Sequence, residues 1–244
     1  MTFCIGIKVA EGLVGIADSR LTSGTEQIRA RKLSIHRPGG KPMFVMSSGL
    51  RSARDKVITY FDEVLEEEQE NFDKLYKAVN RLASQVRKVS DEDKKALEES
   101  SLTFNLHALV GGQLERDAEP KLYMIYPQAN WVEIGQGTPY HIIGNSAYGK
   151  PICDRALRYD TDLKMALKIG ALAFDATRQS ATDVGFPLDV VVYQAETKTM
   201  LEYSYKERDL RQVSQWWKNQ IQRSLQALPS DWVEALFNKP SSPS

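Results

Sequence analysis

Thr2 has the clearest potential for chemistry in this chain, because it directly follows the initiator methionine. Removal of Met1 would leave a free α-amine beside the threonine hydroxyl. A hydroxyl is a weak nucleophile that needs a base within hydrogen-bond reach. A free α-amine, with a pKa of about 7.7–8.0, can be that base. The N-terminus therefore predicts a nucleophile that carries its own base.

Three residues among the next fifty could support this nucleophile: Asp18, Lys32 and Gly49. The Lys32 ammonium would hold the pKa of the α-amine down by repulsion between like charges, and Asp18 would compensate the lysine. The backbone N–H of Gly49 could donate to a developing oxyanion, since glycine permits close approach of the backbone. The alternative is that Thr2 is an ordinary second residue, that Asp18 caps a strand and that Lys32 is a solvated charge.

Cysteine and histidine chemistry has weaker support in the sequence. Cys4 should share a strand face with Thr2, but no histidine lies at a suggestive spacing, and a buried strand cysteine is the commoner case. The three histidines, His36, His107 and His141, lack metal-ligand spacing, so we expect core or surface histidines. We therefore expect neither a metal nor a cofactor.

The N-terminal part of the chain should be a set of strands that positions Thr2. Alternating apolar residues on both sides of a tight turn predict a hairpin whose second strand ends near Asp18. Residues 21–27 are polar and predict a loop. Residues 29–35 and 43–48 predict two further strands. We expect these four strands to form one face of a core, with Thr2 at its edge.

From Arg51 the apolar period changes from two to 3.6, which predicts helices. Two helices, a run of strands, two more helices and two last strands are expected. The helices should lie after Arg51, around 72–86, at 148–157 and at 162–180; the strands at 102–110, 121–126, 131–134, 140–143, 187–194 and 200–205. This order predicts an α+β fold, for which four layers are one option.

The end of the chain differs from the rest. Residues 209–228 predict an amphipathic helix in which Trp216 and Trp217 widen the apolar face. A short helix should follow, and 239–244 should be a disordered tail. We expect a main domain at 1–205 and a helical extension at 206–238. The extension packs either on its own domain or on a neighbouring subunit, because an exposed aromatic face marks an interface.

Composition excludes several classes of partner. The 244 residues carry 32 basic and 32 acidic side chains, a balance that indicates neither nucleic acid nor an anionic membrane as partner. No apolar run approaches the ~18 residues that a membrane span needs, and the opening lacks the pattern of a secretory signal. Cys4 and Cys153 lie far apart, so we expect reduced thiols in a cytoplasm.

These motifs together resemble the β subunits of the proteasome, a family of threonine-type N-terminal nucleophile (Ntn) hydrolases, and most of all its bacterial, proteasome-related branch. The residues that carry the resemblance are the opening Thr2-Phe3-Cys4-Ile5-Gly6-Ile7, the strand end Gly15-Ile16-Ala17-Asp18-Ser19-Arg20, Lys32, Ser48-Gly49, the run 183–189, and Trp216-Trp217 in the extension. The resemblance implies a four-layer αββα sandwich, with two antiparallel sheets between helical layers.

The resemblance also implies further support for the threonine. In proteasome β subunits an Asp and a Ser, three residues apart, come in from a late helix and loop. Here Ser180 stands where the Asp is expected and Asp183 where the Ser is expected, so the pair is present in swapped order. Another supporting serine is implied at Ser146, in the turn that follows Gly144.

The activity implied is cleavage of peptide or amide bonds by Thr2, without cofactor or metal, inside a self-compartmentalised homo-oligomer. The family implies a ring or an open helical assembly. Head-to-tail contacts between subunits form a ring when they close and a helix when they do not. An ATP-dependent unfoldase is an implied partner. Two alternatives stay open: a structural or binding assembly with little hydrolysis, and an amidohydrolase that acts on a small non-protein amide.

Overall fold

The computed structural model describes residues 2–23, 26–68 and 72–238, with the backbone alone described at 21–23 and 26–29. The chain forms two compact units, Met1–Glu207 and Arg208–Ser244, each of which is described by itself. The tail expected at 239–244 lies outside the described residues.

The first sheet holds the N-terminal hairpin at its centre. Its antiparallel order is β10 (Tyr140–Gly144), β1 (Phe3–Val9), β2 (Gly12–Asp18), β11 (Leu188–Gln194) and β12 (Thr199–Tyr205). Every residue of β1 and β2 is buried. Burial on both faces follows from the packing, because helices cover one face of this sheet and the second sheet covers the other.

The second sheet is also antiparallel. Its order is β5 (Leu33–His36), β6 (Met43–Ser48), β7 (His107–Gly112), β8 (Lys121–Ile125) and β9 (Trp131–Glu133). The expectation that the first four strands share one face was therefore wrong. The N-terminal hairpin lies in one sheet and β5–β6 in the other, and the two pairs face each other across an apolar core that includes Cys4, Leu33 and Met46.

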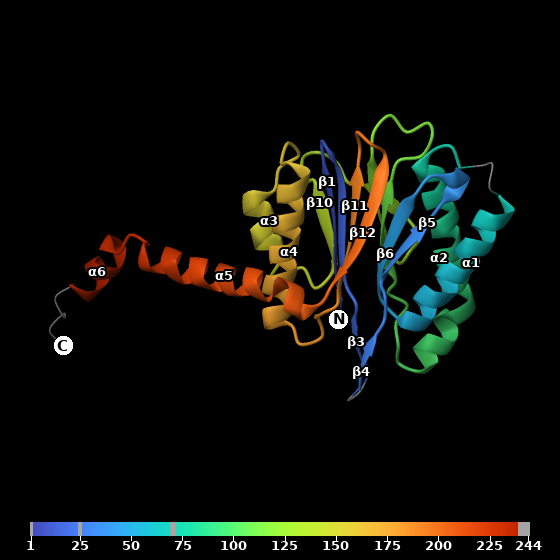
Figure 1. Cartoon of the computed structure of the whole chain (residues 1–244). Coiled ribbons are helices and arrows are strands. Elements are labelled where there is room, and N and C mark those ends of the chain that lie inside the picture. Colours follow the sequence, from blue (N-terminus) through green and yellow to red (C-terminus); the bar gives the residue numbers. More distant parts are fainter. Residues whose placement is uncertain (1, 24–25, 69–71, 239–244) are drawn as a thin grey trace. The chain divides into compact units, whose positions relative to one another are not determined.

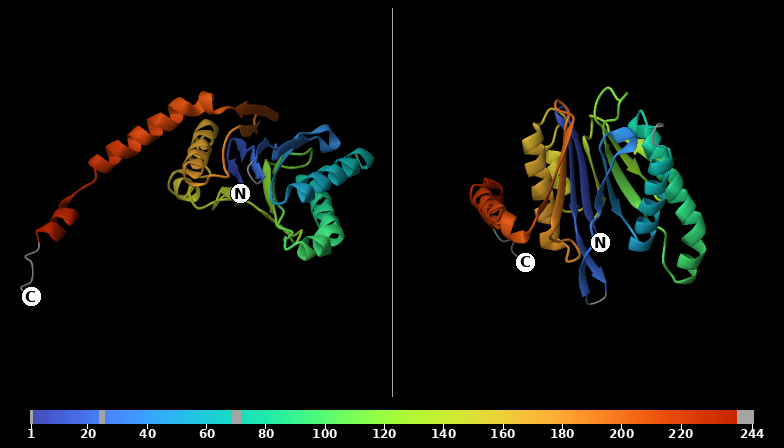
Figure 2. Two further views of the ribbon diagram at one scale, coloured as in Figure 1. Left: turned by 90° about the horizontal axis from the view of Figure 1, so that it is seen from below. Right: turned by 45° about the vertical axis from the view of Figure 1, so that its right-hand side comes forward.

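Helices cover the outer face of each sheet (Figure 1). The pair α1 (Arg51–Glu67) and α2 (Leu75–Glu99) packs on the second sheet around an apolar cluster that contains Phe61 and Val79. The pair α3 (Lys150–Ala156) and α4 (Leu163–Ser180) covers the first sheet. The four layers are visible edge-on in the right-hand view of Figure 2. The predicted α+β, αββα sandwich is thus confirmed.

Several predicted boundaries were wrong. The loop expected at 21–27 was wrong for its described residues, because β3 (Arg20–Ser23) and β4 (Glu26–Arg29) pair with each other as a two-stranded ribbon. The pairing satisfies the backbone groups of both strands although the sequence has no strong apolar alternation there. Helix α2 continues to Glu99 because its charged residues are good helix formers. Strand β7 begins at His107 rather than at 102.

The second unit is helical. It comprises most of α5 (Glu207–Gln226), followed by α6 (Asp231–Phe237), and neither helix has a buried residue. Among the described residues, no helix combines the length and the apolar character that crossing a membrane requires.

Candidate active site

A buried ion pair between Asp18 and Lys32 lies at the start of the chain. The Lys32 Nζ is 2.8 Å from the Asp18 Oδ1, and the two side chains are 4% and 0% exposed. The same carboxylate oxygen accepts the backbone N–H of Phe3 at 2.9 Å. The Lys32 ammonium also donates to the carbonyl of Arg20 at 2.7 Å. The structure therefore brings Asp18 and Lys32 together at the peptide bond that joins Thr2 to Phe3.

The topology of the two sheets explains this meeting. Strands β1 and β2 are antiparallel neighbours. The beginning of β1 and the end of β2, at Asp18, therefore lie side by side at the same end of the sheet. Lys32 immediately precedes β5, which belongs to the facing sheet. The ion pair consequently bridges the two sheets beside Thr2.

Burial and pairing act against each other at Asp18. Burial raises the pKa of the Asp18 carboxyl, while the Lys32 ammonium and the backbone N–H groups of Phe3 and Gly185 lower it. A charge in this position needs a partner, because an unpaired buried ion carries a large desolvation cost. Asp18 and Lys32 therefore depend on each other.

Thr2 itself is held on its other side by the turn after β10. It is 8% exposed, and its carbonyl accepts the backbone N–H of Asn145 at 2.7 Å. Gly144 has a φ of +87°, and a Cβ there would lie 2.0 Å from the Thr2 carbonyl oxygen, so the turn requires glycine. Ser146, half-buried, is two residues further along this turn.

Gly49 occupies the junction between β6 and α1. Its φ is +140°, and a Cβ there would lie 2.9 Å from the Leu106 Cα, so only glycine fits without strain. Ser47, two residues earlier, donates its backbone N–H to the Lys32 carbonyl at 3.0 Å, which ties this junction to the ion pair. The backbone N–H groups at a helix N-terminus favour negative charge, such as an oxyanion.

Ser180 and Asp183 differ in their secondary structure and in their burial. Ser180 is the exposed last residue of α4, and Asp183 is half-buried in the loop before β11. The backbone N–H of Gly185, in the same loop, lowers the pKa of the Asp18 carboxyl. The expected roles of both side chains stay predictions.

A second buried polar pair, Ser19 and Asp189, was not predicted from the sequence. The Ser19 hydroxyl donates to the Asp189 carboxylate, and the two residues are 0% and 2% exposed. The backbone of Ser19, next to Asp18, donates to the carbonyl of Pro187 at 2.8 Å. A signal for this pair was present, because an aspartate inside the apolar run of β11 requires a buried partner.

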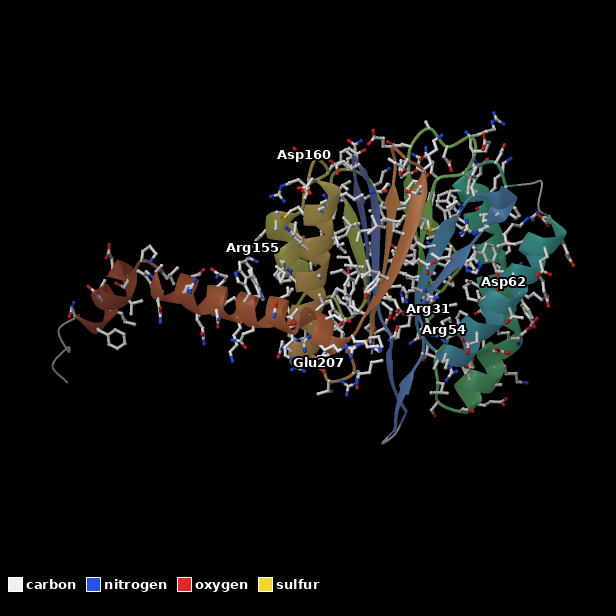
Figure 3. The ribbon with its side chains drawn as sticks, in the orientation of Figure 1. Arg31, Arg54, Asp62, Arg155, Asp160 and Glu207 are labelled. Atoms are coloured by element: carbon white, nitrogen blue, oxygen red, sulfur yellow. The ribbon has the colours of Figure 1, made fainter. Side chains whose placement is uncertain are left out.

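A pocket of about 280 Å³ lies beside Lys32. The side chains that line it include Arg31, Lys32, Ser34, Ser47, Arg54 and Asp55. Arg54 donates to Asp55 from Nε at 2.9 Å and from Nη2 at 2.7 Å. Figure 3 labels Arg31 and Arg54, two of the residues that line this pocket. The pocket is polar and could admit one side chain or a short acyl group.

The other candidate nucleophile lacks the environment it needs. The Cys4 thiol is fully buried, and burial raises its pKa well above the ordinary value. A buried thiol with a raised pKa is not a thiolate at neutral pH. Both cysteines are free and buried. Within the described ranges, no group of three or more His, Cys, Asp or Glu side chains is arranged to hold a metal ion.

The comparisons with known proteins identify the family of this chain. A family model described as proteasome subunit matches residues 2–193, and the chain therefore belongs to the proteasome subunit family. Within that family the chain is similar to Anbu, the ancestral β-subunit, which confirms the expected resemblance to the bacterial branch. A comparison with curated proteins found no match.

Three solved structures illustrate this similarity. Anbu from Yersinia bercovieri is 30% identical, with 93% of this chain and 98% of that chain covered and a TM-score of 0.85. The helical assembly of the Anbu complex from Pseudomonas aeruginosa is 30% identical, with coverages of 99% and 98% and a TM-score of 0.86. Anbu from Hyphomicrobium sp. strain MC1 is 28% identical, with coverages of 99% and 99% and a TM-score of 0.78.

Proposed function

We propose that this protein is a threonine-type Ntn hydrolase that cleaves peptide or other amide bonds with Thr2 as nucleophile. The observation that carries the proposal is the buried Asp18–Lys32 ion pair, which holds the Thr2–Phe3 peptide through the N–H of Phe3. A positive charge buried beside the terminus lowers the pKa of the α-amine, and the α-amine must be neutral to act as a base.

The reaction begins after removal of Met1. The Thr2 hydroxyl attacks the substrate carbonyl, and its proton passes to the Thr2 α-amine. The oxyanion is stabilised by the backbone N–H of Gly49 at the N-terminus of α1. The α-amine then protonates the leaving amine, and an acyl ester on Thr2 remains. Water, activated by the same amine, hydrolyses the ester and restores the enzyme.

Asp18 and Lys32 have supporting roles in this proposal. Lys32 keeps the pKa of the α-amine low by charge repulsion, and Asp18 keeps Lys32 in place. Ser146 lies in the turn that holds Thr2 and is a further supporting hydroxyl. The pocket beside Lys32 receives the substrate side chain next to the scissile bond.

Assembly into a homo-oligomer is part of the proposal. The solved Anbu complex of Pseudomonas aeruginosa is a helical assembly. In this chain, α5 has an apolar face that its own unit does not bury, with Trp216 57% and Leu225 64% exposed. We infer that the extension 206–238 contacts a neighbouring copy in a ring or an open helix, and that an ATP-dependent unfoldase delivers substrates. Two buried free cysteines fit a reducing cytoplasm.

The test is acylation at Thr2. The purified chain, with its N-terminal residue determined, should react with a covalent inhibitor directed at N-terminal threonine, and Thr2→Ala should abolish the adduct. Labelling that survives Thr2→Ala would refute Thr2 as the nucleophile. Scanning peptide and small amide substrates, with and without an unfoldase, separates a protein-degrading assembly from a small-amide hydrolase.

A second candidate is an assembly with little hydrolysis. The exposed position of Ser180, on the segment where family members place support for the threonine, favours it. Its observable sign is an intact Met1 in the isolated protein, because a blocked amine cannot serve as the base.

A further inference from the structure

Strand β5 carries a second set of polar side chains beside Lys32. Successive residues of a strand point to opposite faces. Leu33 and Ile35 pack in the core between the two sheets. His36 packs on the other face, with its ring edge-on to Phe61 of α1 at a centroid distance of 5.4 Å. Ser34 and His36 therefore share the face of β5 that α1 covers.

Ser34, His36 and Asp62 are joined in a hydrogen-bonded row. The Ser34 Oγ lies 2.8 Å from the His36 Nε2. The His36 Nδ1 lies 2.8 Å from the Asp62 Oδ1, which α1 supplies. An ionised carboxylate only accepts hydrogen bonds, so Nδ1 carries the imidazole proton and Nε2 accepts the hydroxyl of Ser34. This is the arrangement of nucleophile, base and orienting acid found in serine hydrolases.

The surroundings of His36 keep its imidazole in the form that can act as a base. The residue is 7% exposed. Burial lowers its pKa, and the nearby Asp62 carboxylate opposes that effect in part. Its neighbours are Asp62 and Phe61 on α1 and, across the strand pair, Met43 on β6. At neutral pH the imidazole is therefore uncharged.

We propose that Ser34 is a second nucleophile of this chain, activated by His36, which forms an acyl ester with small esters that enter the pocket beside Lys32. Ser34 lines that pocket, whose volume of about 280 Å³ suits a short acyl chain. Asp62 is a positioning residue that orients His36. This activity goes beyond the proposed function, since it does not use Thr2.

The proposed step balances in protons and bonds. The Ser34 Oγ adds to the ester carbonyl carbon while its proton moves to the His36 Nε2. The tetrahedral species collapses, the bond to the leaving alkoxide breaks, and His36 returns the proton to that alkoxide. Water then adds to the acyl carbon through the same imidazole, which releases the acid and restores Ser34. The positively charged group in the wall of the same pocket that faces the oxyanion in this proposed step is the Arg54 guanidinium, which also pairs with Asp55.

The experiment treats the full-length Thr2→Ala protein with a fluorophosphonate, which forms a stable adduct with an activated serine, and locates the adduct by peptide mass spectrometry. The expected result is an adduct on Ser34. Replacing His36 by Gln should lower the labelling rate by about 100-fold or more, because a positioned general base contributes that much. Asp62→Asn should lower the rate less and move the midpoint of its pH profile downward, because the carboxylate raises the pKa of His36.

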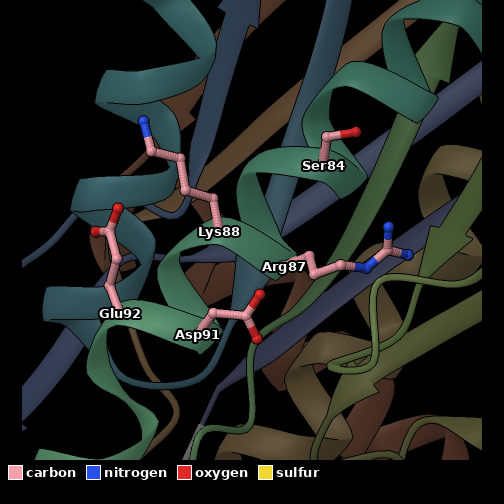
Figure 4. A pocket seen from close by; sticks show the side chains of 5 residues that line it. All are labelled: Ser84, Arg87, Lys88, Asp91 and Glu92. Atoms are coloured by element: carbon pink, nitrogen blue, oxygen red, sulfur yellow. The ribbon is translucent and has the colours of Figure 1, made fainter.

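A matched control is available on α2. Ser84 lines another pocket (Figure 4), but its hydroxyl donates to the backbone carbonyl of Asn80 at 2.9 Å and has no imidazole partner in that contact. Ser84 should stay unlabelled, and Ser84→Ala should not change the rate at Ser34. Absence of an adduct on Ser34, in protein whose circular dichroism and urea unfolding match the unmodified chain, would overturn the proposal. So would equal labelling of Ser34 and Ser84. Neither result bears on acylation at Thr2.

Discussion

The Lys32 ammonium and the Asp18 carboxylate form a 2.8 Å ion pair that joins the two sheets at the end where the chain begins. Asp18 closes β2 in one sheet, and Lys32 leads into β5 in the other. Asp18 also accepts the N–H of Phe3, so the pair fixes the peptide that carries Thr2. The same ion pair therefore links the two sheets and positions the peptide of the candidate nucleophile.

Removal of one charge from this pair should be costly. Asp18→Asn keeps an acceptor for the Phe3 N–H but leaves the Lys32 ammonium buried without its counter-ion. Breaking a buried pair in this way costs about 3–5 kcal/mol, so the free energy of unfolding in urea should fall by that order. Amide hydrolysis should fall with it, because Lys32 would no longer be held beside the terminus.

The control for that variant is an exposed pair. Lys94 and Glu98 are one turn apart on α2, with side chains 63% and 62% exposed. Glu98→Gln should change the free energy of unfolding by less than about 0.5 kcal/mol. If Asp18→Asn and Glu98→Gln lowered the free energy of unfolding equally, the buried pair would stabilise the fold no more than an exposed pair does, which would contradict this prediction.

Gly49 should tolerate no side chain. Its φ is +140°, and a Cβ added there would lie 2.9 Å from the Leu106 Cα, so alanine would strain the junction of β6 and α1. Gly49→Ala should lower the free energy of unfolding by about 1–3 kcal/mol and reduce hydrolysis further, because the proposed oxyanion donor would move. Chemical unfolding and steady-state kinetics measure the two effects.

Gly137 provides the comparison, because a Cβ there meets no atom within 4 Å. Gly137→Ala should leave stability unchanged or raise it by up to about 1 kcal/mol. If Gly49→Ala were as harmless as Gly137→Ala, the junction would not need its glycine.

The αββα sandwich could be anticipated from the sequence because apolar periodicity and the resemblance agreed. The pairing of strands could not, because alternation shows that a strand has a buried face but not which sheet it joins. The distribution of β1–β2 and β5–β6 over two sheets is therefore visible only in the structure. The two-stranded ribbon of β3 and β4 was also missed, because these strands pair with each other outside the two large sheets and their sequence does not show a strong apolar alternation.

The contact between Asp18 and Lys32 could be predicted from the sequence, whereas contacts between residues far apart in the chain could not. Asp18 and Lys32 flank strand ends, so motif spacing could identify them. Ser19 meets Asp189 across 170 positions of sequence, and no local pattern encodes that contact. His36 was expected to be an ordinary core or surface histidine because the three histidines lack metal-ligand spacing. Its contact with Asp62 could not be predicted, because Asp62 lies on a helix whose register against β5 follows from packing.

His36 should make stability depend on pH. Burial lowers its pKa below the ordinary value of 6.5 in the folded state. As pH falls, the unfolded chain therefore binds a proton at His36 at a higher pH than the folded chain does. The free energy of unfolding consequently decreases as pH falls below about 6.5. The loss between about pH 7 and pH 5 should be smaller in His36→Asn, where this titration is absent. Urea unfolding at several pH values measures the difference, and identical slopes for the two proteins would exclude the effect.

The apolar face of α5 should control assembly. Trp216→Ser removes one of its largest exposed aromatic side chains. If the face contacts a neighbouring copy, the mass measured by light scattering should shift toward smaller species. Gln222→Ser, a polar change on the same helix, should leave the mass distribution as it was. An unchanged distribution for Trp216→Ser would argue that α5 is not part of the contact.

The most direct test of Thr2 as the nucleophile is the intact mass of the protein, measured before and after treatment with an inhibitor that reacts with the hydroxyl and α-amine of an N-terminal threonine. We expect a mass without Met1 and a single adduct on Thr2 that Thr2→Ala abolishes. A chain that exposes Thr2 and still forms no adduct, or one that carries the adduct elsewhere, would contradict the assignment of Thr2 as the nucleophile.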